Sequence, residues 1–178
     1  YRGENRCERE TVWIDLQQSD LFSSYSPRVR NVLRKAVKNQ LRVEWVNTSS
    51  AYRTFSAIYK TSLERLQADP FYFFPDDYFD AVSRFRNSYL ALCSKDGILL
   101  AAALFIRESH MMEYQLAAAT LEGFKYGAST LLVHQAGVRA RELGCSILHL
   151  GGGTDNCPEN SLFFFKAGFS RHKAAYRI

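Results

Sequence analysis

Residues 145–170 read CSILHLGGGTDNCPENSLFFFKAGFS, and the rest of the chain can be organised around this stretch. It predicts a short buried strand at 147–150, then a turn made by Gly151, Gly152 and Gly153, then an aromatic segment at 163–169. Glycine lacks Cβ and tolerates positive φ, so a ligand can approach the backbone of such a turn closely. The three glycines are therefore candidate substrate-binding residues.

Lys166 places a cation among phenylalanines at positions 163, 164, 165 and 169. In a site that largely excludes water, such a lysine can donate a hydrogen bond to negative charge, because electrostatic interactions are strong there. The same pattern fits a core helix whose lysine extends to solvent. The residue types alone leave both interpretations open.

The composition predicts one globular domain. The chain has 178 residues, of which 47% are hydrophobic and 14% aromatic, enough for a sizeable core. We expect residues 1–10 to form a linker or ragged end and residues 11–178 to form a single domain. The first residue is Tyr1 and no signal-peptide pattern is visible, which leaves a preceding segment open. No apolar run approaches the roughly 20 residues of a transmembrane segment.

The cysteine spacing and the charge narrow the functional classes. The four cysteines lie far apart without a Cys-x-x-Cys pair, so we expect no metal site and a reduced, cytoplasmic protein. The net charge of +5 favours phosphate-bearing partners but does not by itself identify nucleic acid. Nothing in the sequence predicts the oligomeric state.

A basic helix is predicted at residues 27–38, where a Ser-Pro pair opens it. Apolar residues form a stripe at helical spacing, and cations occupy much of the remaining surface. Arg30, Arg34 and Lys35 are candidates for binding an anionic partner. They can equally belong to an ordinary solvated helix face.

A second helix, predicted over 129–143, follows a loop that contains a glycine. The residues at its entry are Lys125, Gly127, Ala128 and Ser129. Free amide donors and the positive end of the helix dipole favour an anion at such a position. We expect a polar turn at 121–126 and a phosphate- or carboxylate-binding site at the entry. The alternative is an ordinary strand–helix turn.

Several pieces of this sequence resemble the Fem-type peptidoglycan-bridge aminoacyltransferases, relatives within the GNAT superfamily of acyltransferases. HLGGG at 149–153, NSLF at 160–163 and FKAGF at 165–169 follow the order and spacing of that family's signature. The basic segment at 26–45 resembles the stretch that opens the second GNAT domain of those enzymes, with Gln40 where they usually have glycine. The loop before the second helix has one glycine, Gly127, where the coenzyme A loop of other GNAT enzymes usually has two. In this respect it resembles the Fem branch more closely.

The resemblance covers residues 12–169 and implies the GNAT (acyl-CoA N-acyltransferase) fold. This is an α/β fold with a mixed, mostly antiparallel sheet flanked by helices. The element order agrees, since three adjacent strands with hairpin-type connections are expected over 89–117. The resemblance also implies an acyltransferase that moves an aminoacyl or acyl group from an activated carrier to an amine. In the Fem branch the donor is aminoacyl-tRNA and the acceptor is a peptidoglycan precursor.

The resemblance further implies roles for single residues. The lysine of the family's Phe-Lys pair falls on Lys166, which we expect to stabilise charge on the donor or intermediate, while Phe165 shapes the pocket. Apart from the resemblance, an aromatic loop such as that at 69–75 can line an acceptor pocket, although covering a core edge is at least as common, and Tyr72 in this loop is a substrate-binding candidate. No general base is evident, because Asp155 and Glu159 near the glycine turn are equally good turn formers.

We expect no permanently bound cofactor, with aminoacyl-tRNA or acyl-CoA acting as donor co-substrate. The expected partners are tRNA and, as acceptor, an anionic precursor or a small-molecule amine. Two alternatives stay open. One is a coenzyme A-dependent N-acetyltransferase, and the other is a non-catalytic binding domain that retains the GNAT fold.

Overall fold

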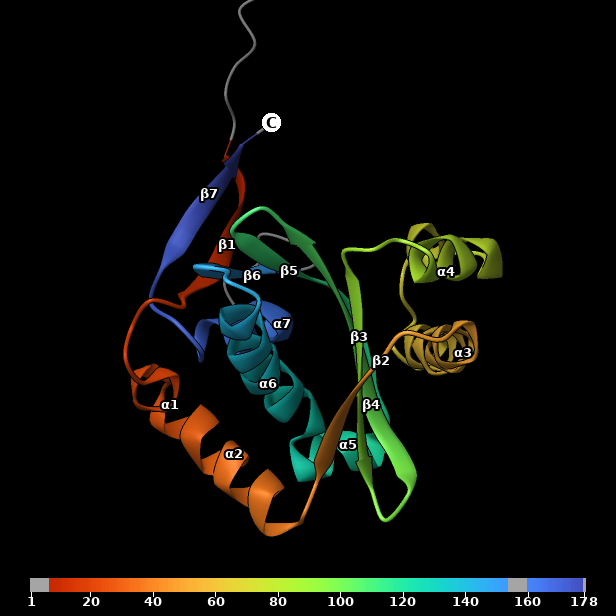
Figure 1. Ribbon diagram of the computed structural model, residues 1–178, viewed down its shortest axis with the longest axis horizontal. Coiled ribbons are helices and arrows are strands. Elements are labelled where there is room, and N and C mark those ends of the chain that lie inside the picture. The colour runs from red at the N-terminus through yellow and green to blue at the C-terminus, as the bar shows by residue number, and fades with distance from the viewer. Residues whose placement is uncertain (1–6, 154–159, 178) are drawn as a thin grey trace, which may run out of the picture.

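The chain folds around a seven-stranded sheet, shown in Figure 1. The computed structural model describes residues 7–153 and 160–177. In sheet order the strands are β2 (Arg42–Val46), β3 (Ser88–Lys95), β4 (Ile98–Glu108), β5 (Met111–Ala119), β6 (Ile147–Gly151), β1 (Cys7–Asp15) and β7 (Lys173–Arg177). Neighbouring strands are antiparallel except β5 and β6, which are parallel. The predicted mixed, mostly antiparallel sheet is confirmed.

Helices cover both faces of this sheet. They are α1 (Leu21–Ser24), α2 (Pro27–Lys38), α3 (Ser49–Arg65), α4 (Asp76–Ser83), α5 (Leu121–Tyr126), α6 (Ala128–Glu142) and α7 (Ser161–Ala167), with a 3-10 turn at Pro70–Tyr72. Figure 1 shows α3 and α4 on one side of β2, β3 and β4, and α1, α2 and α6 on the other. In the described ranges, no helix has the length and apolar character needed to cross a membrane.

The two faces carry separate hydrophobic clusters, and β4 contributes to both. Ala101, Ala103 and Phe105 belong to the cluster that includes α2 and α6, whereas Ala102 and Leu104 belong to the cluster that includes α3 and α4. Successive side chains of a strand point to opposite faces. A continuous apolar strand such as β4 is therefore buried on both sides, and its alanines allow helices to pack closely.

Local signals explain where α2 begins and ends. The Ser26 side chain accepts a hydrogen bond from the Val29 amide, and Pro27 occupies the first helical position. At the other end Gln40 has φ of +57°, and the Leu41 amide donates to the Ala36 carbonyl at 3.2 Å. This arrangement is a Schellman motif, in which the left-handed position favours glycine.

The only parallel pair in the described sheet, β5 with β6, is short, and its strands separate soon after they meet. They pair at three positions, the last of which is Glu113 with His149. Against β4, Phe105 pairs with Tyr114 and Leu104 with Leu116, so one extra residue of β5, Gln115, forms a bulge. A bulge bends its strand. Beyond this point β5 follows β4, while β6 follows β1.

Two expectations from the sequence need correction. Residues 7–10 were expected in a terminal linker, but they form the start of β1, where Glu10 pairs with Ala175 of β7. The polar turn expected at 121–126 is the short helix α5, because the Thr120 side chain accepts a hydrogen bond from the Gly123 amide at 2.9 Å and caps the helix.

Candidate active site

Helix α7 directs Lys166 back toward the glycine turn. Asn160 begins the helix, since its side-chain oxygen accepts a hydrogen bond from the Phe163 amide at 3.0 Å. Lys166 is only 7% exposed, and its Nζ donates to the Gly152 carbonyl oxygen at 2.7 Å. The same nitrogen lies 5.8 Å from the ring centroid of Tyr114. The structure thus contradicts the interpretation in which Lys166 extends to solvent.

The glycine turn has the geometry that its composition predicts. Gly151 has φ of +74°, a backbone conformation that residues other than glycine rarely adopt. A Cβ atom at Gly153 would lie 2.6 Å from the side chain of Asn160. The turn is therefore required for the docking of α7, and it also brings the Gly152 carbonyl to Lys166.

An acidic and an imidazole side chain meet beside this turn. Glu113 Oε1 lies 3.6 Å from His149 Nδ1, at the last paired position of β5 and β6. The His149 imidazole holds the pKa of Glu113 below its usual value, and Lys166 lowers that pKa further, although partial burial opposes both. Glu113 is therefore a carboxylate at neutral pH.

The pair lies on the sheet face opposite α6. His149 is paired across β6 and β1 with Trp13, whose ring stacks on His172 at a centroid distance of 4.5 Å. Successive side chains of a strand point to opposite faces of the sheet. Met112, Leu148 and Ile14, the strand neighbours of these three residues, are fully buried in the cluster with α6.

The sequence analysis missed this pair. The motif contains His149 without revealing a partner for it, and Glu113 stands in an unremarkable strand far from it in the sequence. The signal that joins them is the register of a parallel strand pair, which no local pattern encodes.

Two further candidates lie in different places. Phe165 is half-buried next to Lys166 in the sequence and packs edge-on against Phe169 at 5.3 Å between centroids. Tyr72 lies in the 3-10 turn, where its carbonyl accepts a hydrogen bond from Tyr59, a member of the cluster with α3 and α4. The Tyr72 side chain is exposed and its ring packs edge-on against Phe71, so its role in binding an acceptor stays a prediction.

The loop before α6 is covered by α2. Gly127 has φ of +77°, and a Cβ atom there would lie 2.4 Å from the Val32 side chain. Ala128 is fully buried, Ser129 is partly exposed, and Lys125 is exposed with its Nζ 5.8 Å from the Tyr126 ring centroid. Val32 of α2 thus occupies the space beside Gly127, and the phosphate site at this loop stays a prediction.

The basic helix presents its cations to solvent. Arg34 and Lys35 are exposed and Arg30 is half-buried. The Arg34 guanidinium donates to the Asn31 side chain at 2.9 Å and lies 5.2 Å from the centroid of the Phe22 ring. No acidic residue interrupts α2, so the charges on its outer surface are all positive.

Lys166, Glu113 and His149 together offer the groups that acyl transfer to an amine requires. An ammonium can stabilise the oxyanion of a tetrahedral intermediate. A carboxylate beside an imidazole can accept the proton that the attacking amine must lose. Lys166 is near enough to Glu113 to lower the pKa of that carboxylate, and all three groups lie where β5 and β6 separate.

The seven-stranded sheet with helices on both faces is the architecture of α/β acyltransferases. Residues 23–161 match the family model described as acetyltransferase (GNAT) domain. The match covers most of the chain, which therefore belongs to the GNAT family. The predicted GNAT fold is confirmed.

Solved structures agree on the fold. FemX superimposes with a TM-score of 0.81 at 18% identity over 94% of this chain and 60% of its own. The C-terminal domain of a putative lysylphosphatidylglycerol synthetase from Agrobacterium fabrum gives a TM-score of 0.71 at 17% identity, over 98% of this chain and 60% of that one. L-PGS from Bacillus licheniformis gives 0.64 at 13% identity, over 86% and 49%. The chain thus spans 60% or less of these proteins. No curated protein sequence matches it.

Proposed function

We propose that this protein transfers an aminoacyl group from aminoacyl-tRNA to an amine acceptor. The observation that carries the proposal is that Lys166, held against the Gly152 carbonyl, is near enough to Glu113 to lower the pKa of that carboxylate, with His149 beside it. The acceptor nitrogen forms a bond to the ester carbonyl carbon, and Lys166 stabilises the resulting oxyanion. The Glu113–His149 pair takes the proton that the nitrogen loses. When the intermediate collapses, the carbon–oxygen bond to the ribose breaks and the ribose oxygen regains a proton.

Three observations favour aminoacyl-tRNA as the donor. The signature and the basic helix resemble the Fem branch. Helix α2 covers the loop where a coenzyme A pyrophosphate is expected, since Val32 packs against Gly127. The outer surface of α2 carries five cations and no acidic residue, which suits a large polyanion. This donor, together with the buried free thiols of Cys93 and Cys145, fits a cytoplasmic protein.

The proposed acceptor is an anionic peptidoglycan precursor or another small amine. The GNAT name itself supports a second candidate, an N-acetyltransferase that uses acetyl-CoA, with Lys125 and Ser129 at the loop before α6 binding its phosphates. A third candidate is a binding domain that retains the fold without turnover.

The test supplies the full-length protein with radiolabelled aminoacyl-tRNA or radiolabelled acetyl-CoA, together with a panel of amines that includes peptidoglycan precursors. We expect label to reach an amine from aminoacyl-tRNA and not from acetyl-CoA. Transfer from acetyl-CoA alone would replace the proposal with the second candidate. Tight binding of either donor without transfer would support the third.

A further inference from the structure

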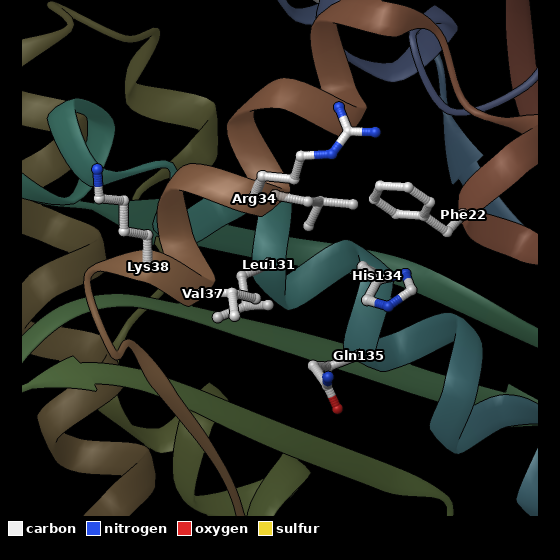
Figure 2. A pocket seen from close by; sticks show the side chains of 8 residues that line it. Phe22, Arg34, Val37, Lys38, Leu131, His134 and Gln135 are labelled. Atoms are coloured by element: carbon white, nitrogen blue, oxygen red, sulfur yellow. The ribbon is translucent and has the colours of Figure 1, made fainter.

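A groove lies between α2 and α6, as Figure 2 shows. Its volume is about 370 Å³, within the range of small-ligand sites. The side chains that line it are Phe22, Leu33, Arg34, Val37, Lys38, Leu131, His134 and Gln135. None of these residues is Lys166, Glu113 or His149, and the proposed reaction gives the groove no role.

The charge of the groove selects an anionic occupant. Arg34 and Lys38 lie one turn apart on α2 and border it, and no acidic residue lines it. The acidic residue at the far end of α6, Glu142, is already paired with Arg139 at 2.9 Å. Val37 is 67% exposed at the rim, so apolar surface remains open beside the cations.

The open surface of the groove is mainly apolar, and polar side chains border it. Four of the eight lining residues, Arg34, Lys38, His134 and Gln135, carry polar groups, and an acyl chain would offer these groups no hydrogen-bonding partner. Burial lowers the pKa of His134, so the ring is neutral, and its Nδ1 lies 3.3 Å from the Tyr25 hydroxyl. One ring nitrogen is thereby engaged, and the other can hydrogen-bond to an occupant.

A nucleotide with an unpaired base satisfies these requirements together. Its flat apolar face can stack against the pair formed by Phe22 and Arg34, in which the guanidinium lies 5.2 Å from the ring centroid. Its polar edge can hydrogen-bond to Gln135 and His134, while its phosphates meet Arg34 and Lys38. A regular duplex has no exposed base to offer.

We propose that the groove between α2 and α6 binds an unpaired nucleotide of an RNA. The proposal rests on the proposed function for its source, which is the tRNA that carries the donor group. Helix α2 then serves two purposes, because its outer face attracts the phosphate backbone and its inner edge holds one base. The groove positions the RNA, and Lys166 acts on the ester elsewhere in the molecule.

The test measures binding of a labelled single-stranded RNA and of a blunt RNA hairpin by fluorescence anisotropy across salt concentrations. We expect the single strand to bind more tightly. Gln135→Ala and Phe22→Ala should each weaken its binding roughly tenfold without changing the salt slope, because a stacked or hydrogen-bonded base is uncharged. Neither substitution should affect the hairpin.

Matched variants separate base binding from simple attraction. Arg34→Ala and Lys35→Ala each remove one exposed cation from neighbouring positions of α2, and both should reduce the salt slope by about one. Only Arg34 borders the groove, so Arg34→Ala should weaken the single strand several-fold more than Lys35→Ala. Gln17→Ala, an exposed glutamine in the turn after β1, controls for Gln135→Ala. Thermal unfolding verifies that each variant folds.

The inference is overturned if Gln135→Ala and Phe22→Ala both bind single-stranded RNA like the unaltered protein. It is also overturned if coenzyme A, or vesicles containing phosphatidylglycerol, bind with the sensitivity to Gln135→Ala that is expected of RNA. Its failure is distinguishable from failure of the proposed function. If the protein transfers from aminoacyl-tRNA but these variants bind RNA like the unaltered protein, the proposed function stands and the RNA-binding role of the groove is refuted. If RNA binding depends on the groove but no transfer occurs, the groove assignment stands and the proposed function is refuted.

Discussion

A buried ammonium is costly unless a hydrogen bond or an anion compensates it, and Lys166 has both kinds of neighbour. The Gly152 carbonyl accepts a hydrogen bond from Lys166 Nζ at 2.7 Å, and the Glu113 carboxylate is close enough for Lys166 to lower the pKa of that carboxylate. The arrangement holds a cation in a partly desolvated place where an incoming carbonyl oxygen would interact with it strongly.

At the scale of single residues, Glu113→Gln tests whether Glu113 accepts the proton of the attacking amine. The substitution keeps the size of the side chain and removes its charge, so we expect transfer to fall by about 10²-fold or more. In the unaltered protein, activity should be lost as pH falls through the lowered pKa of Glu113, because protonation removes the base. This acidic limb should disappear from the residual activity of the variant.

The control for this prediction is Glu108→Gln, an exposed carboxylate at the end of β4. It should keep full activity and the same pH profile. If Glu113→Gln behaves like Glu108→Gln, the pair of Glu113 and His149 takes no part in proton transfer.

Residue patterns predicted one half of this site and not the other. Lys166 and the three glycines stand in a single stretch whose order and spacing carry the resemblance. The partnership of Glu113 with His149 depends on which residues of two distant strands lie opposite each other. That register is set by packing across the whole sheet.

At the scale of elements, α2 carries an unusual end. Gln40 occupies the left-handed position of a Schellman motif, which costs a side chain about 1 kcal/mol or more relative to glycine. The resemblance to Fem-type enzymes places a glycine at this position, and the φ of +57° gives the physical reason.

Gln40→Gly should therefore stabilise the protein. We expect the free energy of unfolding to rise by about 0.5–1 kcal/mol in urea denaturation, since relief of the left-handed strain exceeds the entropy that glycine adds to the unfolded chain. Gln17→Gly, at a position without positive φ, should be neutral or destabilising. An equal loss of stability in both variants would rule out strain at Gln40.

The cations of α2 should also act together on RNA. Changing Arg30, Arg34 and Lys35 to glutamate should weaken tRNA binding and flatten its dependence on salt, because fewer counterions are released. Changing Arg53, Arg84 and Arg86 to glutamate introduces the same charge change beside α3 and α4. If both triple variants bind tRNA equally well across salt, the cations of α2 form only a solvated face.

At the scale of the whole molecule, the clusters on both sheet faces enclose groups that resist deprotonation. Burial raises the pKa of Tyr59 and of the Cys93 thiol to about 12 each, and it also raises those of Tyr25, Tyr52, Tyr78 and Tyr114. The unfolded chain releases these protons at lower pH than the folded chain does. Their contribution to stability is therefore complete below the ordinary values of 9.0 and 10.0 and is lost as pH rises toward the folded values.

We therefore expect the urea midpoint to fall steadily between about pH 8 and about pH 10.5. Unfolding at the alkaline end should coincide with the appearance of tyrosinate absorbance. A constant midpoint over this range would mean that the tyrosines and Cys93 are not buried as described.

Local patterns predicted most elements but not their assembly. The order of helices and strands, and the hairpins of β3, β4 and β5, follow from periodicity and turn residues. The place of β1, which pairs with β6 on one side and β7 on the other, does not follow from them. These partners come from the opposite end of the chain, and only closure of the whole fold selects them.

The central claim is that the Lys166 site performs acyl transfer, and the single-turnover rate of Lys166→Met tests it most directly. With the donor that supports turnover, we expect the chemical step to fall by about 10²-fold or more while the unfolding temperature stays close to that of the unaltered protein. Lys166→Arg should recover little, because a planar guanidinium does not replace a compact ammonium beside Gly152. A rate for Lys166→Met within about threefold of the unaltered protein would contradict the account.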